Sequence, residues 1–247
     1  MDALQSIVIG AGQAGLSSSY HLQRLGISHV VLDANPGPGG AWQHRWDSLT
    51  MNDVHGVADL PGAIAPNSSS ARANEVVPDW YGAYEHEHNL PIIRPVDVDS
   101  VSDLDGDPDG MLIVQAGEQQ WATQTLINAT GTWRRPFIPY YPGQETFRGE
   151  QLHTADYPGR EHFRGKRVVV VGAGASATQF IGEIATISDV VWVTRRPLRR
   201  ASEDFSGRDL IARVQETVLE GRVPRRSSQY SGIYLRPQEK EAEATGV

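Results

Sequence analysis

The start of the chain alternates between short apolar runs and a stretch with helical spacing. The run Ile7 to Ile9 predicts a buried strand, and the leucines that follow it recur at the spacing of an amphipathic helix. A second run, Val30 to Leu32, predicts another strand and ends on Asp33. Strand, helix and strand in this order are typical of a βαβ unit in a parallel sheet.

A glycine-rich turn joins the first predicted strand to the helix. Gly10 suits the tight turn, Gly12 allows a pyrophosphate close to the backbone, and Gly15 allows the helix to pack on the strand. The spacing from Gly15 to Asp33 is close to the roughly 20 residues expected between the glycine turn and an acid that binds a ribose. The sequence therefore favours a dinucleotide site over a purely structural turn, with these candidate residues: Gly10, Gly12, Gln13, Gly15 and Asp33.

A loop of glycine and proline follows Asp33 and leads into a tryptophan. Glycines before Trp42 suit a backbone that passes close to a flat ligand and then covers it with an aromatic ring. A surface turn with core tryptophans explains the same residues equally well. Gly40 and Trp42 are therefore candidate cofactor contacts.

The middle of the chain changes its periodicity. A long irregular loop spans Gly56 to Asn74, and helical spacing predicts a short helix from Glu75 to His88. Ile92 to Val101 reads as one strand, and Met111 to Val114 with Trp121 to Ile127 reads as a hairpin. These strands predict a small β-meander.

The last strand of that meander runs into small residues. Asn128 is followed by Ala129, Thr130 and Gly131, which permit a bound cofactor to approach closely. Thr130 and Gly131 are accordingly candidate contacts.

A second unit of the same kind begins at Arg167. The valine run to Val171 predicts a strand, a glycine turn opens a second helix, and Val190 to Val193 predicts the next strand. Where the first unit ends on an acid, this one has Arg195 and Arg196, which favour the 2′-phosphate of NADP over the ribose hydroxyl of NAD. The candidate residues are Gly172, Gly174, Ser176, Ala177, Arg195 and Arg196. A further helix is expected from Asp209 to Leu219, with no third βαβ unit.

The net charge and the cysteine content argue against several kinds of function. The 247 residues are 39% hydrophobic, carry a net charge of −8 and hold no cysteine. The acidic balance argues against nucleic-acid binding, and the missing thiols exclude disulfides, thiolate metal sites and redox dithiols. His86 and His88 point to different helix faces, so no metal site is expected. No apolar run is long enough to cross a bilayer and no signal peptide is visible, so we expect a cytoplasmic protein without a membrane partner.

Together these motifs resemble the flavin-containing monooxygenases with two dinucleotide-binding domains. The first glycine turn with Asp33 resembles the FAD site of that family, and Gly39-Gly40-Ala41-Trp42 is similar to its GGxW segment. The stretch from Phe147 through His153 to Tyr157 matches the signature FxGxxxHxxxY, and Gly172 to Ala177 resembles the NADPH-binding GxGxSA. Asn128 to Gly131 is similar to the ATG strand beside FAD.

The resemblance implies an α/β flavoprotein fold with two Rossmann-like units and a β-meander. An FAD-binding domain is expected over residues 1–150 and a partial NADPH-binding domain over residues 151–247. Relatives of this kind continue with strands that these residues do not hold, so the fold is expected to be incomplete at its C-terminal side.

The resemblance also implies a reaction. NADPH would reduce FAD, and the reduced flavin would form a C4a-(hydro)peroxide with O2 that oxygenates a nitrogen or sulfur nucleophile of a small molecule. Asn52 matches an asparagine near the flavin and is the candidate catalytic residue, although an asparagine in a polar turn explains it as well.

Two alternatives remain open at this point. Tyr157 stands where Baeyer–Villiger relatives usually carry tryptophan, which ranks ketone oxygenation lower. A non-catalytic or partner-dependent fragment would bind nucleotide without turnover, and its exposed apolar sheet edges would favour homo-oligomers.

Overall fold

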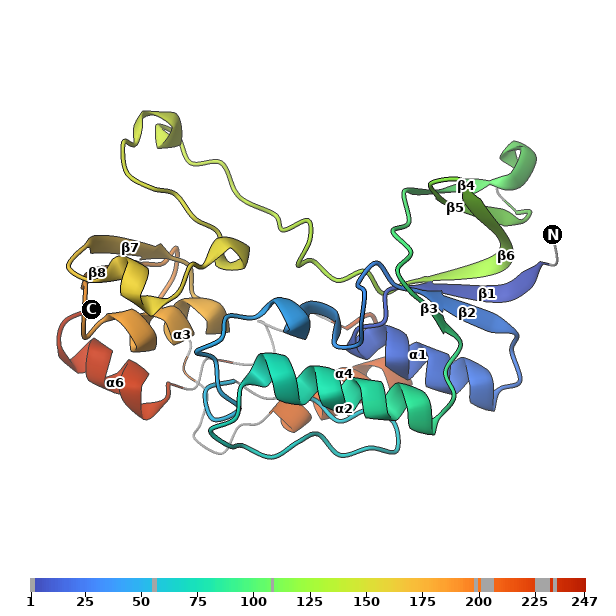
Figure 1. Ribbon diagram of the computed structural model, residues 1–247, viewed down its shortest axis with the longest axis horizontal. Helices are drawn as coiled ribbons and strands as arrows, with labels where there is room; N and C mark the ends of the chain where they lie inside the picture. Colours follow the sequence, from blue (N-terminus) through green and yellow to red (C-terminus); the bar gives the residue numbers. More distant parts are fainter. Residues whose placement is uncertain are drawn as a thin grey trace. The chain divides into compact units, whose positions relative to one another are not determined.

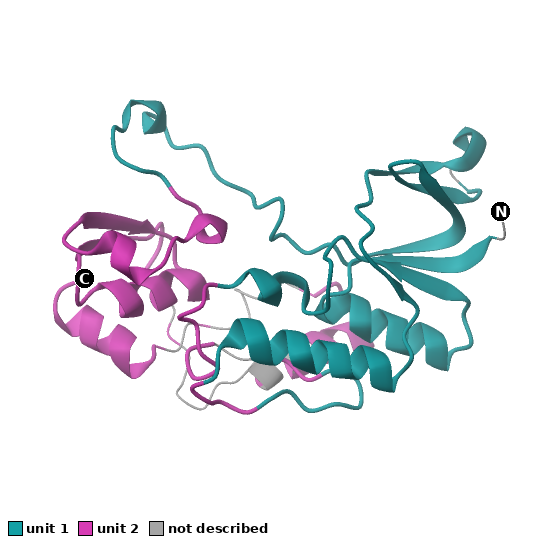
Figure 2. Cartoon of the chain, in the orientation of Figure 1, with its two compact units in different colours: residues 1–45, 60–66, 71–151 teal, residues 46–59, 67–70, 152–247 magenta. Residues whose placement is uncertain are grey.

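The computed structural model describes residues 3–54, 57–107, 109–197, 200, 207–224, 232 and 235–247. The chain divides into two compact units (Figure 2). The first unit comprises Met1–Arg45, Leu60–Pro66 and Ala71–Gln151, and the second comprises Trp46–Asp59, Asn67–Ser70 and Leu152–Val247. Two short segments from the first third of the sequence thus belong to the second unit.

The first unit is built on a six-stranded sheet with the order β3-β2-β1-β6-β5-β4 (Figure 1). Strands β1, β2, β3 and β6 run parallel, whereas β4, β5 and β6 form an antiparallel meander. The predicted hairpin and meander are confirmed. The strands are β1 (Leu4–Ile9), β2 (His29–Leu32), β3 (Ile92–Ile93), β4 (Ser100–Asp103), β5 (Leu112–Ala116) and β6 (Gln119–Asn128).

Two helices belong to this unit, and both confirm the sequence pattern. Helix α1 (Gln13–Arg24) connects β1 to β2, and it buries Leu16 in the core that also contains Ile7 and Val31. Helix α2 (Ala73–Glu87) buries Val77, Tyr81 and Tyr84, with Pro78 in its first turns. Pro78 is the sixth residue of this helix, so it has no N–H to donate to the carbonyl of Asn74 four residues before it.

The strand expected from Ile92 to Val101 is wrong, because the structure splits it. Ile92–Ile93 forms β3 beside β2 at one edge of the sheet, and Ser100–Asp103 starts β4 at the other edge. Pro95 cannot donate a ladder hydrogen bond, and the next amide, Val96 N–H, donates to Asp33 O at 2.8 Å. The residues between the strands therefore carry the chain across the carboxyl edge of the sheet.

The second unit contains a two-stranded parallel sheet with helices. Strand β7 (Arg167–Val171) pairs in register with β8 (Asp189–Val193), and α3 (Ala175–Ile184) connects them. Ile181, Ile184, Val190 and Ala242 form its core. The predicted second βαβ unit is confirmed. The remaining α-helices described are α4 (Gly207–Leu219), as expected, and α6 (Pro237–Ala244).

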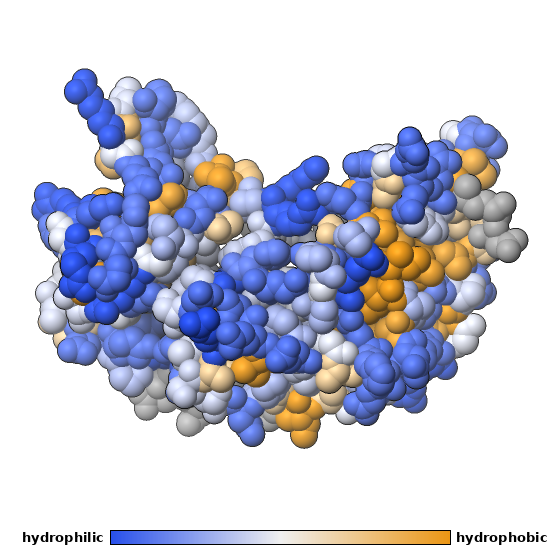
Figure 3. Space-filling model, viewed as in Figure 1, coloured by the Kyte–Doolittle hydropathy of each residue, from blue (hydrophilic) through white to orange (hydrophobic). Residues whose placement is uncertain are grey.

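Short 3₁₀ turns complete the described elements: η1 (Gly40–His44), η2 (Leu104–Gly106), η3 (Gln144–Thr146), η4 (Thr154–Asp156) and η5 (Arg160–Phe163). None of the described helices is long and apolar enough to cross a membrane. Figure 3 shows a mostly hydrophilic face with hydrophobic residues gathered over strands of the six-stranded sheet.

Candidate dinucleotide sites

The first glycine turn is held tightly against the end of β6. Gly10 has a φ of +100°, and a Cβ there would lie 2.5 Å from the carbonyl oxygen of Ala129. A Cβ on Gly15 would lie 1.8 Å from the carbonyl oxygen of Gly10, so the helix can approach the turn only without a side chain. At Gly12, no heavy atom of the described residues lies within 4 Å of such a Cβ. The turn is closed on the protein side and open at Gly12.

The amino end of α1 opens at this same turn. Gly12 is its N-cap, and among the described residues no side chain caps the helix. The first turn of the helix contains Gln13 and no acidic residue. Unpaired N–H groups and the positive end of the helix dipole make such a terminus suitable for a phosphate.

Two further candidate segments meet this turn. A Cβ on Gly40 would lie 2.9 Å from the Cα of Gly12, so the glycine pair before Trp42 abuts the first turn. Ala129 N–H donates to Ile9 O at 2.9 Å, which places Thr130 and Gly131 beside it. The structure therefore brings three candidate segments together at the carboxyl edge of β1 and β6: the first glycine turn, Gly40–Trp42 and Thr130–Gly131. That edge is where open α/β sheets bind ligands.

Asp33 lies at the end of β2 and is buried. Its Oδ1 accepts hydrogen bonds from the backbone N–H (3.4 Å) and side-chain amide (3.1 Å) of Asn35, and its Oδ2 accepts one from Arg94 Nε at 2.9 Å. Arg94 also donates two 2.7 Å bonds to Glu85. A carboxylate has about four lone-pair sites, so one remains for a ribose hydroxyl. Sequence patterns did not indicate Arg94 or Glu85, because their partner is distant along the chain.

The second glycine turn repeats this construction with one addition. Gly172 has a φ of +137°, and its N–H donates to Val193 O at 2.9 Å. The indole of Trp192 donates to Gly172 O at 2.7 Å, which fixes the turn from the neighbouring strand. Gly174 is the N-cap of α3, with no described atom within 4 Å of a Cβ placed on it.

The other candidates of the second unit differ in exposure. Ala177 is buried against the turn, and Ser176 is half-buried in the first turn of α3. Arg195 and Arg196 follow β8 and are exposed. Within the described ranges neither arginine forms an ion pair, so both guanidinium groups can bind an anionic ligand.

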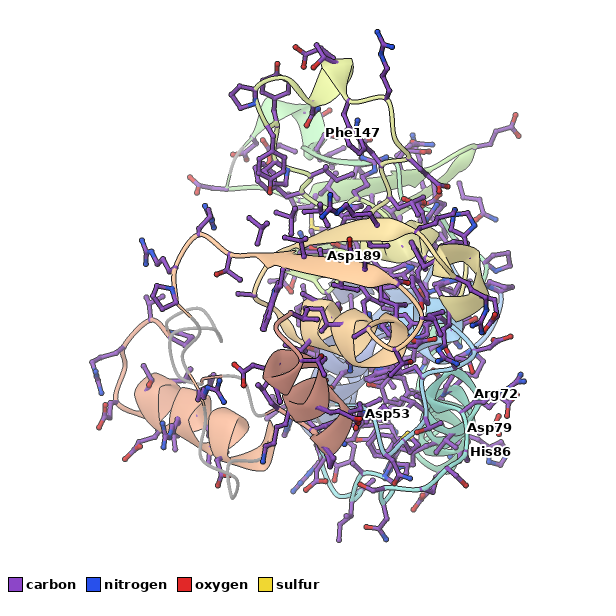
Figure 4. The ribbon with its side chains drawn as sticks, turned by 90° about the vertical axis from the view of Figure 1, so that its left-hand side faces the viewer. Asp53, Arg72, Asp79, His86, Phe147 and Asp189 are labelled. Atoms are coloured by element: carbon purple, nitrogen blue, oxygen red, sulfur yellow. The ribbon has the colours of Figure 1, made fainter. Side chains whose placement is uncertain are left out.

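Asn52 belongs to the second unit, although it precedes residue 150 in the sequence. Its N–H donates to Ser69 O at 2.9 Å, and its side chain is exposed. The neighbouring Asp53 accepts hydrogen bonds from Thr50 Oγ1 (2.5 Å) and Gln238 Nε2 (2.9 Å), and its carbonyl accepts one from Gln179 Nε2 (3.0 Å). Figure 4 shows Asp53 beside α6.

Tyr157, the last residue of the signature that begins at Phe147, packs in an aromatic cluster of the second unit. The ring of Tyr157 stacks on Phe163 and Phe180, with centroid distances of 5.5 and 4.4 Å, and meets Trp46 edge-on. Burial raises the pKa of Tyr157, and the nearby Glu183 raises it further, so the phenol stays neutral. In the part of the chain that the structure describes, no group of three or more histidine or acidic side chains could hold a metal.

Known proteins resemble this chain over most of its length. Residues 7–229 match the family described as pyridine nucleotide-disulphide oxidoreductase. A flavin-containing monooxygenase from Stenotrophomonas maltophilia is 36% identical, and the match covers 100% of this chain and 69% of that one with a TM-score of 0.83. The chain belongs to the flavin-containing monooxygenase-like members of this family. These 247 residues hold no cysteine, so they contain no redox dithiol.

Curated relatives of this monooxygenase-like chain are more distant. An uncharacterized oxidoreductase, CzcO, from Bacillus subtilis is 29% identical over 182 residues, which is 73% of this chain and 51% of the relative. Senecionine N-oxygenase from Tyria jacobaeae is 27% identical over 217 residues, with 73% and 44% covered. The chain spans about half the length of the first curated relatives it matches.

Proposed function

We propose that this chain carries the two dinucleotide sites of an FAD- and NADPH-dependent monooxygenase. The observation that carries the proposal is the pair of strand–glycine turn–helix units, each with an uncapped, open helix terminus. Membership of the monooxygenase-like family supports the same assignment.

FAD is assigned to the first unit. Its pyrophosphate would lie on the open backbone at Gly12 and Gln13, and its adenosine ribose would bond to Asp33. The segments of Gly40–Trp42 and Thr130–Gly131 would line the same carboxyl edge of the sheet. The fit rests on the packing of the turn: a Cβ at Gly10, Gly15 or Gly40 would clash with neighbouring backbone atoms, whereas a Cβ at Gly12 would meet no described atom within 4 Å.

NADPH is assigned to the second unit. Its pyrophosphate would bind at Gly172, Gly174 and Ser176, with Ala177 packed beneath the turn. Arg195 and Arg196, exposed and without acidic partners in the described residues, would bind the 2′-phosphate. Guanidinium groups match phosphate oxygens in geometry and charge, so we expect NADPH to be preferred over NADH.

When bound, the flavin would take up a hydride from NADPH and pass its two electrons to O2, so that one oxygen atom is added to a small-molecule substrate and the other leaves as water. The residues of this chain bind and orient the two nucleotides. We assign to the exposed side-chain amide of Asn52 a hydrogen bond to NADPH, whose proposed site is in the same unit. The similarity to senecionine N-oxygenase supports a nitrogen nucleophile, with a sulfur nucleophile as its chemical analogue, and the match to cyclopentanone 1,2-monooxygenase keeps a ketone as the alternative substrate.

The test is an absorption spectrum of the purified chain with added FAD, before and after NADPH in air. We expect a retained flavin band that bleaches and then recovers as NADPH is oxidised. Asn52→Ala should change the ratio of oxygenated product to released peroxide. The double variant Arg195→Ala with Arg196→Ala should weaken the binding of NADPH more than the binding of NADH.

A chain that stays colourless with excess FAD would contradict the proposal and favour a non-catalytic or partner-dependent fragment. If flavin is retained and NADPH is not oxidised, the FAD site stands and the NADPH site fails. Amines, sulfides and ketones would then be compared as substrates only for a chain that passes both steps.

A further inference from the structure

Arg45 contacts two tryptophan rings in the first unit. It follows η1, and its guanidinium carbon lies 4.4 Å from the ring centroid of Trp133 and 5.5 Å from that of Trp42. Both distances are within the range of a cation–π contact. The two rings therefore hold the guanidinium in one place.

This cation has no acidic partner among the residues that the structure describes. Its Nε is buried without a hydrogen-bond acceptor, and burial lowers the pKa of Arg45. Arg94 and Arg134, in the same unit, instead make paired hydrogen bonds to carboxylates. Burying a charge is costly unless an opposite charge compensates it. The described residues of the unit supply a carboxylate to Arg94 and Arg134 but none to Arg45, so the charge of Arg45 calls for an anionic partner from outside them.

The position of Arg45 connects it to the first glycine turn. It directly follows η1 (Gly40–His44), whose first residue, Gly40, abuts the backbone of Gly12. Trp133 lies two residues after Gly131, in the segment that follows β6 and contacts Gly10 through Ala129. The two segments that hold the guanidinium are thus the two that line the proposed FAD site.

We propose that Arg45 supplies the positive charge that binds an anionic or electron-rich group of FAD. The inference rests on the proposed function, since it takes the ligand of the first unit to be FAD. Two parts of FAD have this chemistry: the pyrophosphate and the N1–C2=O edge of the flavin ring. Trp42 and Trp133 keep the side chain in place in the free protein, so little conformational freedom is lost on binding.

The experiment titrates the apoprotein with FAD and follows the quenching of flavin fluorescence. Arg45→Met removes the charge and keeps the length of the side chain, and Arg45→Lys keeps the charge. Arg24→Met is the matched control: Arg24 also lies over an aromatic ring, Tyr20 at 5.8 Å, but at the carboxyl end of α1. ADP and riboflavin are titrated separately by isothermal titration calorimetry, because each carries one of the two groups and ADP has no flavin fluorescence.

We expect Arg45→Met to weaken FAD binding by about tenfold or more, as for the loss of a charge-assisted hydrogen bond. Arg45→Lys should lose less, and Arg24→Met should stay within about twofold of the unsubstituted chain. A matching loss for ADP identifies the pyrophosphate as the group bound, and a matching loss for riboflavin identifies the flavin edge.

Unchanged FAD affinity in Arg45→Met, with the unsubstituted chain binding FAD, would overturn the proposal and leave the proposed function standing. An unsubstituted chain that binds no FAD would overturn both. If Arg45→Met melts before it can be titrated, Arg45→Gln decides, because it keeps a polar side chain and removes only the charge: a loss of about tenfold or more supports the charge contact, and unchanged affinity contradicts it.

Discussion

Arg94 joins two carboxylates that are shielded from water. Asp33, Glu85 and Arg94 have side-chain exposures of 5%, 13% and 13%. Burial lowers the pKa of Arg94, but the hydrogen bonds and charges of Glu85 and Asp33 outweigh this and raise it above the ordinary value. The three side chains connect the end of β2, the end of α2 and the residue after β3.

Arg94→Gln should destabilise the chain strongly because it leaves two buried carboxylates without their cation. The expected loss in the free energy of unfolding is about 3–5 kcal/mol, measured by urea denaturation. Arg134→Gln is the control, since its pair with Asp97 has the same two-bond geometry at 2.8 Å but is exposed. That control should lose less than about 1 kcal/mol, and equal losses in the two variants would refute the explanation.

Tyr84 makes stability depend on alkaline pH. Its hydroxyl donates to Pro61 O at 2.9 Å, and burial, with smaller contributions from Tyr20 and Glu87, raises its pKa to about 12. The folded state therefore keeps this proton after the unfolded chain has lost it. The contribution to stability is complete below about pH 10, the pKa of an unfolded tyrosine, and is lost as the pH rises to about 12.

Tyr84→Phe removes the hydroxyl, so this group no longer contributes to the difference in bound protons between the folded and unfolded states. Between about pH 10 and 12, the free energy of unfolding of the unsubstituted chain should fall more steeply than that of the variant, by up to about 1.4 kcal/mol per pH unit. Urea denaturation at several pH values measures both slopes. Parallel slopes would show that Tyr84 does not titrate with a raised pKa.

At the scale of elements, the local sequence pattern predicted the helices and strands that are formed by contacts between residues close in the sequence. The first βαβ unit and the second were read correctly from apolar runs and glycines, because each strand is followed by its own helix. The strand from Ile92 to Val101 was read wrongly, since its two ends pair with different edges of one sheet. Which unit Asn52 joins depends on contacts with residues far along the chain, such as Gln179 and Gln238, and no local pattern records these.

The segment around Asn52 is held by Asp53. Ser48 Oγ donates to Glu183 at 2.5 Å, and Arg236 donates to Val54 O, so contacts with α3 and the start of α6 lie on both sides of Asp53. Asp53 itself receives side-chain bonds from Thr50 and Gln238. This carboxylate is therefore the central anchor of the segment that presents the Asn52 side chain.

Asp53→Ala should free the Asn52 segment while the β7–β8 sheet stays folded. Hydrogen exchange should become faster at the Asn52 amide by about tenfold or more, because two charge-assisted bonds are lost. Mass spectrometry of peptides from this segment and from β7 measures both. Asp189→Ala, which breaks an exposed pair with Arg167, is the control; if it accelerates exchange at Asn52 as much as Asp53→Ala does, Asp53 is not the anchor.

At the scale of the whole molecule, the β7–β8 sheet has one apolar face that the described residues leave open. Val169, Val171, Val191 and Val193 are 54%, 53%, 42% and 44% exposed. The alternate positions, including Val190 and Trp192, pack in the core of the second unit. Parallel sheets usually bury both faces, so this valine face (Val169, Val171, Val191 and Val193) leaves an unusual apolar area in contact with water.

We expect the valine face to bind a hydrophobic dye and to promote self-association as concentration rises. Val169→Thr with Val191→Thr changes two residues that are paired across the strands, and threonine keeps the branched shape that strands favour. Dye fluorescence and the sedimentation coefficient at high concentration should both fall. Val190→Thr on the buried face is the control, because it adds an unpaired hydroxyl to the core and should cost about 1–3 kcal/mol of stability without lowering dye binding. Undiminished dye fluorescence in the double variant would mean that this face is covered in solution, and that the apolar area seen by the dye lies elsewhere.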